Sequence, residues 1–304
     1  MTVRVAVPAS SANLGPGYDC FGLALGLYNE FEAHLSDEWS VEVQGEGAGS
    51  LPSGVDNQVA RAAARLFAEI GRPELRAEIT CHNGIPVGRG LGSSAAAIVG
   101  GLVLADTLAE GRLGRRRLLE LAIGIEGHAD NVAAALRGGF TISSTRHPRK
   151  MTAHIDPAGG LAVLVIMGEH ELPTEVARDA LPAVVPHTDA AANSANAALV
   201  ALGIALGVPG YLKSGLHDAI HERYREALIP DLQPVRRLIE TLDAGPAVLS
   251  GAGPTIIALV QAGDDKRALE RARALAEAAR PALYEVGRGR VIALPIDRAG
   301  ARFL

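Results

Sequence analysis

A glycine-rich loop followed at once by a long apolar helix is the feature that most constrains this sequence. The segment Pro86-Val87-Gly88-Arg89-Gly90-Leu91-Gly92 precedes Ser93 and an apolar stretch that runs to about Leu108. Glycines permit positive φ angles and close approach of the backbone to a ligand. The N-terminus of a helix attracts phosphate through its N–H groups and its dipole. The order of these parts predicts a phosphate-binding turn between a strand and a helix.

Two common phosphate-binding patterns do not fit this loop. The lysine of the Walker loop is missing, and the GxGxG spacing with the helix following directly differs from the dinucleotide-binding fingerprint. On the residues alone, a tight turn capped by a serine and holding no ligand stays open as an alternative.

Composition and charge narrow the class of protein. Of the 304 residues, 48% are hydrophobic and 21% are charged, which is typical of a globular chain with a sizeable core. The net charge of −5 gives no reason to expect a nucleic-acid partner. Two cysteines are too few for a disulfide or metal framework, and no apolar run has the length of a membrane span or the place of a secretory signal. We expect a cytoplasmic protein that does not enter a membrane.

Strands and helices alternate without a strict βαβ rhythm, which favours an α+β fold. The hydrophobic patterns predict strands near 2–7, 30–35, 39–43, 77–81, 140–144, 161–167, 246–249, 255–260 and 290–296. They predict helices near 56–70, 93–108, 115–124, 131–136, 174–181, 188–206, 232–242 and 265–279. We place a boundary near residue 160, which gives the domains 1–160 and 161–304.

Two further segments accompany the glycine-rich loop. They are Pro8-Ala9-Ser10-Ser11-Ala12-Asn13-Leu14-Gly15-Pro16-Gly17-Tyr18-Asp19 and Ser250-Gly251-Ala252-Gly253-Pro254-Thr255. Each alone is more often a turn than a site. In this order, the three resemble the three signature motifs of the GHMP kinases, a resemblance that extends from Pro8 to Thr255. It implies the two-domain GHMP kinase fold, with a ribosomal-protein-S5-like N-terminal domain that binds the nucleotide and a ferredoxin-like C-terminal domain.

Within this family the chain is most similar to the homoserine kinases. The similarity rests on the first motif and on the segments Glu126-Gly127-His128-Ala129-Asp130-Asn131-Val132-Ala133, Thr174-Glu175-Val176-Ala177-Arg178-Asp179-Ala180-Leu181-Pro182 and Tyr224-Arg225-Glu226-Ala227-Leu228-Ile229-Pro230. It implies ATP-dependent phosphorylation of the hydroxyl of L-homoserine to O-phospho-L-homoserine, a step of threonine biosynthesis.

The resemblance also assigns residues to the nucleotide and to a metal ion. ATP would be bound by Asn57 and by Pro86, Val87, Gly88, Arg89, Gly90, Leu91, Gly92, Ser93, Ser94, Ala95 and Ala96. Asn57 is also expected to cap its helix. Mg²⁺ would be held by Glu120 and Ser94, because one carboxylate and one hydroxyl suffice when phosphates supply other ligands. A solvent-exposed Glu120 and a Ser94 that only caps its helix remain the alternative.

The expected substrate residues match the chemistry of an amino acid with a primary hydroxyl. Arg178 and Arg225 correspond to the family's two substrate arginines, which would hold the carboxylate in bidentate fashion. The ammonium group needs acceptors such as Asn13, Asp19 or Asp130. The resemblance adds His128 and Gly253 to the substrate-binding set.

Three residues form the expected catalytic set, which is Asn131, Thr174 and Asp130. Some relatives use an aspartate as the base where this chain has Asn131, and an amide cannot take a proton at neutral pH. We therefore expect Asn131 to orient the hydroxyl, with the proton leaving to a phosphate oxygen or to water. Asp130 as the base is the alternative.

Other interpretations stay open on the sequence. His217 and His221 have the spacing of zinc-binding histidines on a helix, but Asp218 stands where the HExxH pattern has glutamate, which favours a structural or solvated pair. A kinase for another small hydroxyl compound and a nucleotide-binding regulator without activity are the rival functions. The sequence allows a homodimer and does not fix the oligomeric state.

Overall fold

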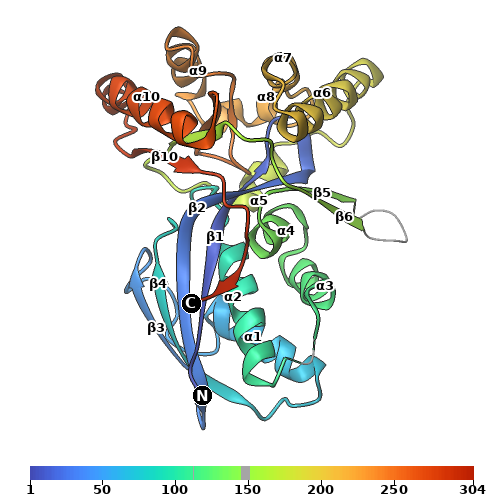
Figure 1. The fold of residues 1–304 in the computed structure, drawn as a ribbon, viewed down its shortest axis with the longest axis vertical. Helices are drawn as coiled ribbons and strands as arrows, with labels where there is room; N and C mark the ends of the chain where they lie inside the picture. The colour runs from blue at the N-terminus through green and yellow to red at the C-terminus, as the bar shows by residue number, and fades with distance from the viewer. Residues whose placement is uncertain (112, 145–150) are drawn as a thin grey trace.

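The computed structural model describes residues 1–111, 113–144 and 151–304 and contains two β-sheets flanked by helices (Figure 1). The first sheet contains β1 (Val3–Asn13), β2 (Gly17–Ser36), β3 (Ser40–Gly45), β4 (Arg76–Asn83), β5 (Phe140–Ser144), β6 (Met151–Ile155) and β11 (Arg302–Phe303). The second contains β7 (Leu161–Ile166), β8 (Ala247–Leu249), β9 (Ile256–Gln261) and β10 (Val291–Pro295). The α+β prediction is confirmed.

The order of the strands shows that the end of the chain joins the sheet in which the chain begins. The first sheet has the order β11-β1-β2-β4-β3, and β5 and β6 extend it from β2. The second has the order β10-β7-β9-β8. Every pairing among the described strands is antiparallel except that of β3 with β4. Strand β11, from the end of the chain, therefore completes the sheet that β1 begins.

The helices divide between the two sheets. On the first sheet lie α1 (Gln58–Glu69), α2 (Ser93–Leu108) and α4 (Asp130–Arg137), and α3 (Arg115–Glu126) packs against these helices. The later helices are α5 (Thr174–Asp179), α6 (His187–Leu206), α7 (Pro209–Gly215), α8 (Glu222–Arg225), α9 (Leu232–Thr241) and α10 (Asp265–Glu285), and residues Glu226–Leu228 form a 3₁₀ turn.

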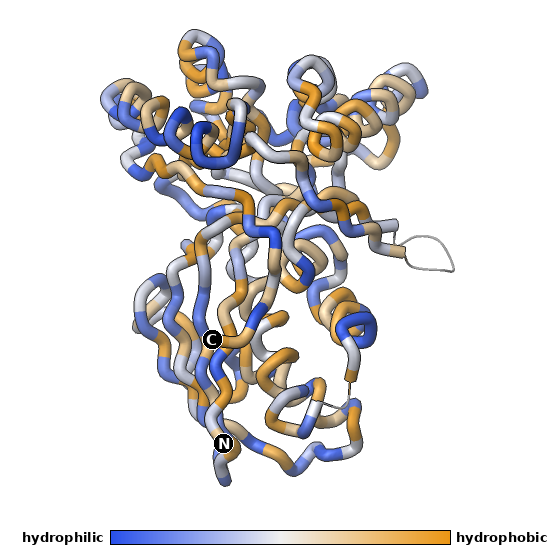
Figure 2. Tube along the Cα trace, in the orientation of Figure 1, coloured by the Kyte–Doolittle hydropathy of each residue, from blue (hydrophilic) through white to orange (hydrophobic). Residues whose placement is uncertain are grey.

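Helix α2 is the central element of the first half. It contacts α1, α3, α4, β1 and β2, and its buried residues lie on all sides of the helix; Figure 2 shows mainly hydrophobic colour where the helices pack in this half of the molecule. A helix that is hydrophobic on all sides is stable only when neighbours cover every face. Gly100 and Gly101 allow this packing, because a Cβ on either would lie within 2.5 Å of Phe31 or of the Val59 carbonyl oxygen. The loop before α2 is thus attached to a helix that neighbouring elements cover on all sides.

Most predicted elements are present with shifts of a few residues at their ends. The helix at 93–108 and the strand at 140–144 have the predicted bounds, and β7 is buried along its whole length, as its continuous apolar run predicted. The sequence patterns did not predict β6, α7, α8 and β11, and they predicted only residues 30–35 of β2. The proposed boundary at residue 160 remains a prediction: β7 begins at Leu161, yet Leu161, Val163 and Val165 pack in the same hydrophobic cluster as β1 and α2.

Helix α6 is the one helix of the described ranges with the length and apolar composition of a membrane span, and only 22% of its apolar window is buried. Its contacts nevertheless tie it to neighbouring elements. Asn193 Nδ2 donates to the Pro16 carbonyl at 2.8 Å, Asp189 forms an ion pair with Arg223, and Gly203 packs against Leu212 of α7.

We predict opposite stability effects for alanine at two helical glycines. A Cβ at Gly101 would lie 2.2 Å from the Val59 carbonyl oxygen, so Gly101→Ala must move backbone and should lower the free energy of unfolding by about 1–3 kcal/mol. A Cβ at Gly124, on the exposed face of α3, meets no atom within 4 Å. Gly124→Ala should raise the free energy of unfolding by about 0.4–1 kcal/mol. Urea denaturation of both variants measures the contrast, and equal effects would contradict the packing described for α2.

Candidate active site

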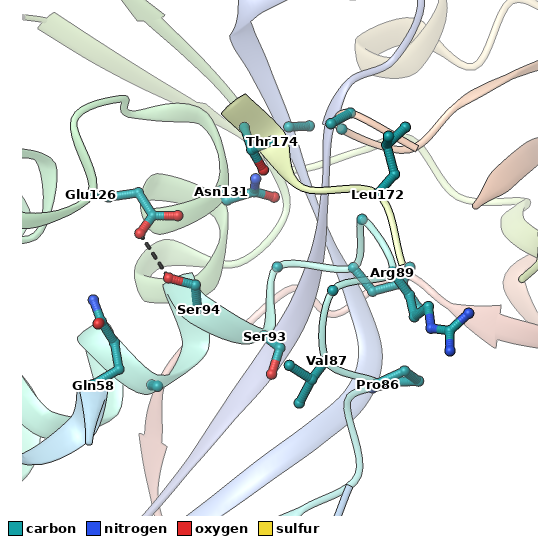
Figure 3. Close-up of a pocket in the computed structure, with 18 of the residues that line it drawn as sticks. Gln58, Pro86, Val87, Arg89, Ser93, Ser94, Glu126, Asn131, Leu172 and Thr174 are labelled. Atoms are coloured by element: carbon teal, nitrogen blue, oxygen red, sulfur yellow. Dashed lines mark hydrogen bonds between the residues drawn. The ribbon is translucent and has the colours of Figure 1, made fainter. Parts of the chain in front are cut away.

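A cavity of about 370 Å³ lies where three glycine-containing segments meet. They are called the first loop (residues 8–19, including the end of β1), the second loop (86–92) and the third loop (250–255). Its wall includes residues of β1 and β2, the start of α1, the loop and first turn of α2, the region 126–131, α5, Arg225 and residues 251–253. Segments more than 200 positions apart in the sequence therefore contribute to one site (Figure 3).

The three loops are joined by hydrogen bonds. The Ser250 hydroxyl is fully buried; it donates to the Gly90 carbonyl at 2.6 Å and lies 2.9 Å from the Ser11 hydroxyl. The backbone adds two bonds: Ser10 N donates to Leu91 O at 3.1 Å, and Gly251 N donates to Ala12 O at 3.0 Å. Each loop is thus fixed by contacts to both of the others.

The loop before α2 presents backbone donors to the cavity. Gly88, Gly90 and Gly92 all have positive φ angles, and Gly92 is the N-cap of α2 without a side-chain cap. A Cβ at Gly92 would lie 2.2 Å from Ser10 Oγ, so the close approach of the first loop requires glycine there. The first N–H groups of a helix have no partner within the helix, so this turn can bind an anion such as a phosphate group.

The carboxylate beside Ser94 is Glu126 and not Glu120, the residue predicted from the sequence to share a metal ion with it. Ser94 Oγ donates to Glu126 Oε2 at 3.0 Å, and Figure 3 shows both side chains at the first turn of α2. Glu120 does not line the cavity; it lies on the outer side of α3 and forms ion pairs with Arg116 and Arg117 at 3.2 and 2.8 Å. The structure therefore does not bring Glu120 and Ser94 together.

Glu126, His128 and Asp130 form a cluster of titratable groups. His128 Nδ1 lies 2.8 Å from Asp130 Oδ1, and its Nε2 lies 4.0 Å from Glu126 Oε1. The hydrogen bond to Asp130 raises the pKa of His128, although burial opposes this. Burial raises the pKa of Glu126, while His128 and the Ser94 hydroxyl oppose the shift. A protonated His128 would place one positive charge between two carboxylates.

Asn131 and Thr174 lie together at the cavity wall, where Figure 3 shows the Thr174 side chain pointing towards Asn131. The Ser10 hydroxyl donates to Asn131 Oδ1 at 2.9 Å. This bond leaves the amide NH₂ of Asn131 as the group that can contact a ligand, and that group is a donor. Asp130 Oδ1 accepts from the Asn131 backbone N–H at 2.7 Å as well as contacting His128.

Two arginines and one aspartate bring charges of both signs to the cavity. Arg178 donates to both carboxylate oxygens of Asp19, at 3.0 and 2.6 Å, and to the Tyr18 hydroxyl at 3.0 Å. Arg225 is buried, and burial lowers its pKa. No carboxylate of the described residues lies within ion-pair distance of Arg225. A buried cation without an anionic partner is costly, so this cavity is suited to a ligand that carries a carboxylate.

Asn13 connects the first loop to this charged region. Its Nδ2 donates to the Gly251 carbonyl at 2.7 Å, and its Oδ1 accepts from the Asp19 backbone N–H at 3.0 Å. Asn13 and Asp19 both have positive φ angles, which are uncommon for residues other than glycine. This backbone conformation places the Asp19 carboxylate beside Arg178.

Family models and known proteins give a consistent match. The model of the GHMP kinases N terminal domain matches residues 57–139, and that of the GHMP kinases C terminal matches residues 196–278. A homoserine kinase of Streptomyces avermitilis is 43% identical over 271 residues, which cover 87% of this chain and 88% of that protein. One from Microchaete diplosiphon is 37% identical over 306 residues, covering 100% of this chain and 97% of that protein. The chain belongs to the homoserine kinases of the GHMP kinase family.

The crystal structure of homoserine kinase from Cytophaga hutchinsonii has the same GHMP kinase fold. It superposes with a TM-score of 0.88 at 27% identity and covers 100% of this chain and 97% of that one. The resemblance inferred from the three motifs and the two-domain α+β GHMP kinase fold are confirmed.

Most residues predicted for the site of a GHMP kinase line this cavity. They are Asn13, Asp19, Asn57, the loop 86–92, Ser93, Ser94, His128, Asp130, Asn131, Thr174, Arg178, Arg225 and Gly253. Ala95 and Ala96 are buried in α2 and do not line it. Asn57 caps α1 through a bond from Val59 N at 3.1 Å and donates to the Pro52 carbonyl, so both ends of its amide are already used. The ligand contacts of all these residues remain predictions.

Sequence reasoning missed several residues of the GHMP kinase cavity. Gln58, Tyr18 and Leu172 line it without any signal beyond their place beside predicted segments. Glu126 could have been found from the sequence, because it begins the segment Glu126–Ala133, which resembles the homoserine kinases. His221 is buried and His217 is exposed, and their interpretation as a structural or solvated pair stays a prediction.

We predict a pH-dependent contribution of His128 to stability. Its folded pKa is raised mainly by Asp130, above an unfolded value near 6.5, so its stabilisation is fully present below that value and is lost as pH rises through the folded pKa. The free energy of unfolding that His128→Gln removes should therefore be larger at pH 6 than at pH 9. In an Asp130→Asn background this difference should shrink. An equal loss at both pH values, measured by urea denaturation, would contradict the assignment.

Proposed function

We propose that this chain transfers the γ-phosphoryl group of ATP to the hydroxyl of L-homoserine. GHMP kinases use ATP, and the relatives with 37–43% identity are homoserine kinases. One observation supports the substrate class above others: Arg225 is a buried guanidinium with no carboxylate partner among residues 1–111, 113–144 and 151–304, in the same cavity as the N-terminus of α2. A neutral sugar or a simple alcohol would leave that charge uncompensated.

In this proposal the amino acid is bound by exchange of ion pairs. Arg178 is already engaged by Asp19. A zwitterion can share Arg178 and Arg225 through its carboxylate and bring its ammonium group to Asp19. The ligand carboxylate then contacts both arginines and the ammonium group contacts Asp19, so each of these charged groups has a partner of opposite sign. Asn13 and Gly253 complete the wall on this side of the cavity.

The phosphates would lie against residues 88–94, where the backbone donors of α2 begin. Ser94 and Glu126 are hard oxygen ligands of the kind that Mg²⁺ prefers, and Glu126 is partly buried and forms no ion pair with a lysine or arginine in the part of the chain that the structure describes. Two protein oxygens leave room for phosphate and water ligands. A bound Mg²⁺ would neutralise charge on the transferred phosphoryl group. These residues fit the ion, and Ser94 and Glu126 are the residues that would hold it.

The reaction forms a bond between the homoserine oxygen and the γ-phosphorus and breaks the bond from that phosphorus to the bridging oxygen of ADP. Asn131 offers its NH₂ group and can orient the attacking oxygen, but it cannot accept a proton. We therefore retain transfer of the proton to a phosphate oxygen or water. Asp130 as base is less favoured, because its Oδ1 already accepts from Asn131 N and contacts His128.

Location and assembly also remain proposals. Cys20 and Cys81 are free thiols, and burial raises the pKa of Cys81 to about 12, which keeps that thiol protonated and unreactive. Free thiols suit the cytoplasm, which is the location that we propose. The sequence also suggested a homodimer and no membrane or nucleic-acid partner, and we keep these as proposals.

The proposed activity is tested with a panel of acceptors. Purified protein with Mg-ATP should release ADP fastest with L-homoserine, more slowly with L-threonine or L-serine, and not with mevalonate. Omission of Mg²⁺ should abolish turnover. Preference for mevalonate or a sugar would overturn the substrate assignment, and nucleotide binding without any turnover would favour the regulator hypothesis.

A matched pair of variants separates Glu126 from Glu120. Glu126→Gln removes the charge that would hold Mg²⁺ beside Ser94, so kcat should fall by about a hundredfold or more, as when one preorganised electrostatic group is lost. Glu120→Gln disrupts only exposed ion pairs with Arg116 and Arg117 and should change kcat less than twofold. Steady-state kinetics over a range of Mg²⁺ concentrations measures both. The reverse ranking would restore Glu120 as the metal ligand.

A further inference from the structure

We infer that His221 is a positioning residue that fixes the Arg225 guanidinium in the orientation needed to receive the substrate carboxylate. The inference rests on the proposed function and adds a residue to it. His221 does not line the cavity. It acts behind Arg225, on the side that faces away from the ligand.

The Arg225 guanidinium is held at two of its nitrogen atoms. Nε donates to the Ala177 carbonyl at 3.1 Å. Nη1 donates to the Gly251 carbonyl at 3.2 Å and lies 3.0 Å from His221 Nδ1. Nη2 makes no hydrogen bond to another residue in the described part of the chain. Because Arg225 lines the cavity, Nη2 is the atom left for a ligand.

The contact to Arg225 determines which nitrogen of His221 carries the proton. A guanidinium only donates, so Nδ1 must be unprotonated to accept from Nη1. A neutral ring then has its proton on Nε2, and Nε2 lies 2.8 Å from the Gly15 carbonyl, which only accepts. Both neighbours therefore select the same neutral tautomer. Protonation of Nδ1 would direct an N–H at the arginine.

Asp218 fixes the segment that carries the histidine. Its side chain and that of His221 are both 0% exposed. Asp218 Oδ2 accepts from the backbone N–H groups of Ile220, His221 and Glu222 at 3.1, 2.8 and 2.7 Å. Oδ1 has no hydrogen bond to a described residue, but it lies 3.5 Å from His221 Nε2. The carboxylate thus favours the proton on Nε2 as well.

Tyr18 restricts the faces of the same groups. Its ring lies 5.2 Å from the His221 ring, and the guanidinium carbon of Arg225 lies 5.4 Å from the Tyr18 ring centre. The guanidinium is therefore restrained by Tyr18 on a face and by Ala177, Gly251 and His221 at its edge. Among the edge contacts to Arg225, only the one from His221 comes from a side chain and can be removed by substitution.

Kinetics of three variants tests the role of His221. Asparagine places its Oδ1 close to the position of Nδ1 and can still accept from Arg225, whereas leucine cannot. His221→Leu should raise KM for homoserine by roughly tenfold or more, the loss expected for one hydrogen bond to a charged group. KM for ATP and kcat at saturating homoserine should stay within about twofold. His221→Asn should recover most of the lost affinity, and His217→Leu, in the exposed neighbouring loop, is the control and should match the wild type.

Nitrogen NMR of the imidazole in the unsubstituted protein gives a measurement that does not depend on folding of the variants or on the substrate. We expect His221 to show a protonated Nε2 and an unprotonated Nδ1. A proton on Nδ1, or an equal rise in KM for His221→Leu and His221→Asn, would overturn the inference. Failure of the unsubstituted protein to phosphorylate homoserine would instead overturn the proposed function and leave the tautomer result standing.

Discussion

The arrangement of the site depends on the hydrogen bonds of the buried Ser250 hydroxyl, because this one group contacts the other two loops. It bonds to Gly90 of the second loop and contacts Ser11 of the first. Around it, Gly90 and Gly92 approach so closely that a Cβ on either would lie within 2.5 Å of an atom of another loop. The glycines and serines of these motifs thus contact one another and hold the three loops together without a ligand. Their backbone donors are consequently fixed before any nucleotide binds, which is the preorganisation that phosphoryl transfer requires.

The charges around the cavity are arranged in layers. Asp19 and Arg178 form an ion pair at the cavity wall, where Arg225 is also present but buried. His221 and Asp218 lie on the other side of Arg225, away from the cavity. His221 contacts the Arg225 guanidinium, and Asp218 in turn accepts from the His221 backbone N–H, so these two residues hold Arg225 from the side away from the ligand. An arginine with several rotatable bonds can be a precise ligand only when such neighbours remove its freedom.

Sequence reasoning was most successful where a local pattern determines the structure. The apolar run of α2 and the glycines before it predicted both the helix and the loop, and the three motifs together predicted the family. It did not place Glu126 beside Ser94, because the choice between two carboxylates of one helix, Glu120 and Glu126, depends on helical phase. Glu120 and Glu126 are six residues apart, which places them about 120° from each other around a helix of 3.6 residues per turn, so they face different directions. The arginines three and four residues before Glu120 indicated an exposed ion-paired face. Strand β11 was missed for another reason, since two residues carry no periodic signal and their pairing with β1 is a tertiary contact.

That pairing of β11 with β1 has a consequence for any attempt to divide the chain. Ala6 and Val5 of β1 pair with Arg302 and Phe303, and Ala301 N donates to Ala135 O in α4. A fragment ending near residue 160 would keep nearly all of the first sheet but lose the partner of its outer strand. β1 would then present unsatisfied backbone groups beside the apolar Val3, Val5 and Val7, an arrangement that promotes edge-to-edge aggregation. The first half of this chain therefore has a complete sheet only when the last residues of the second half are present.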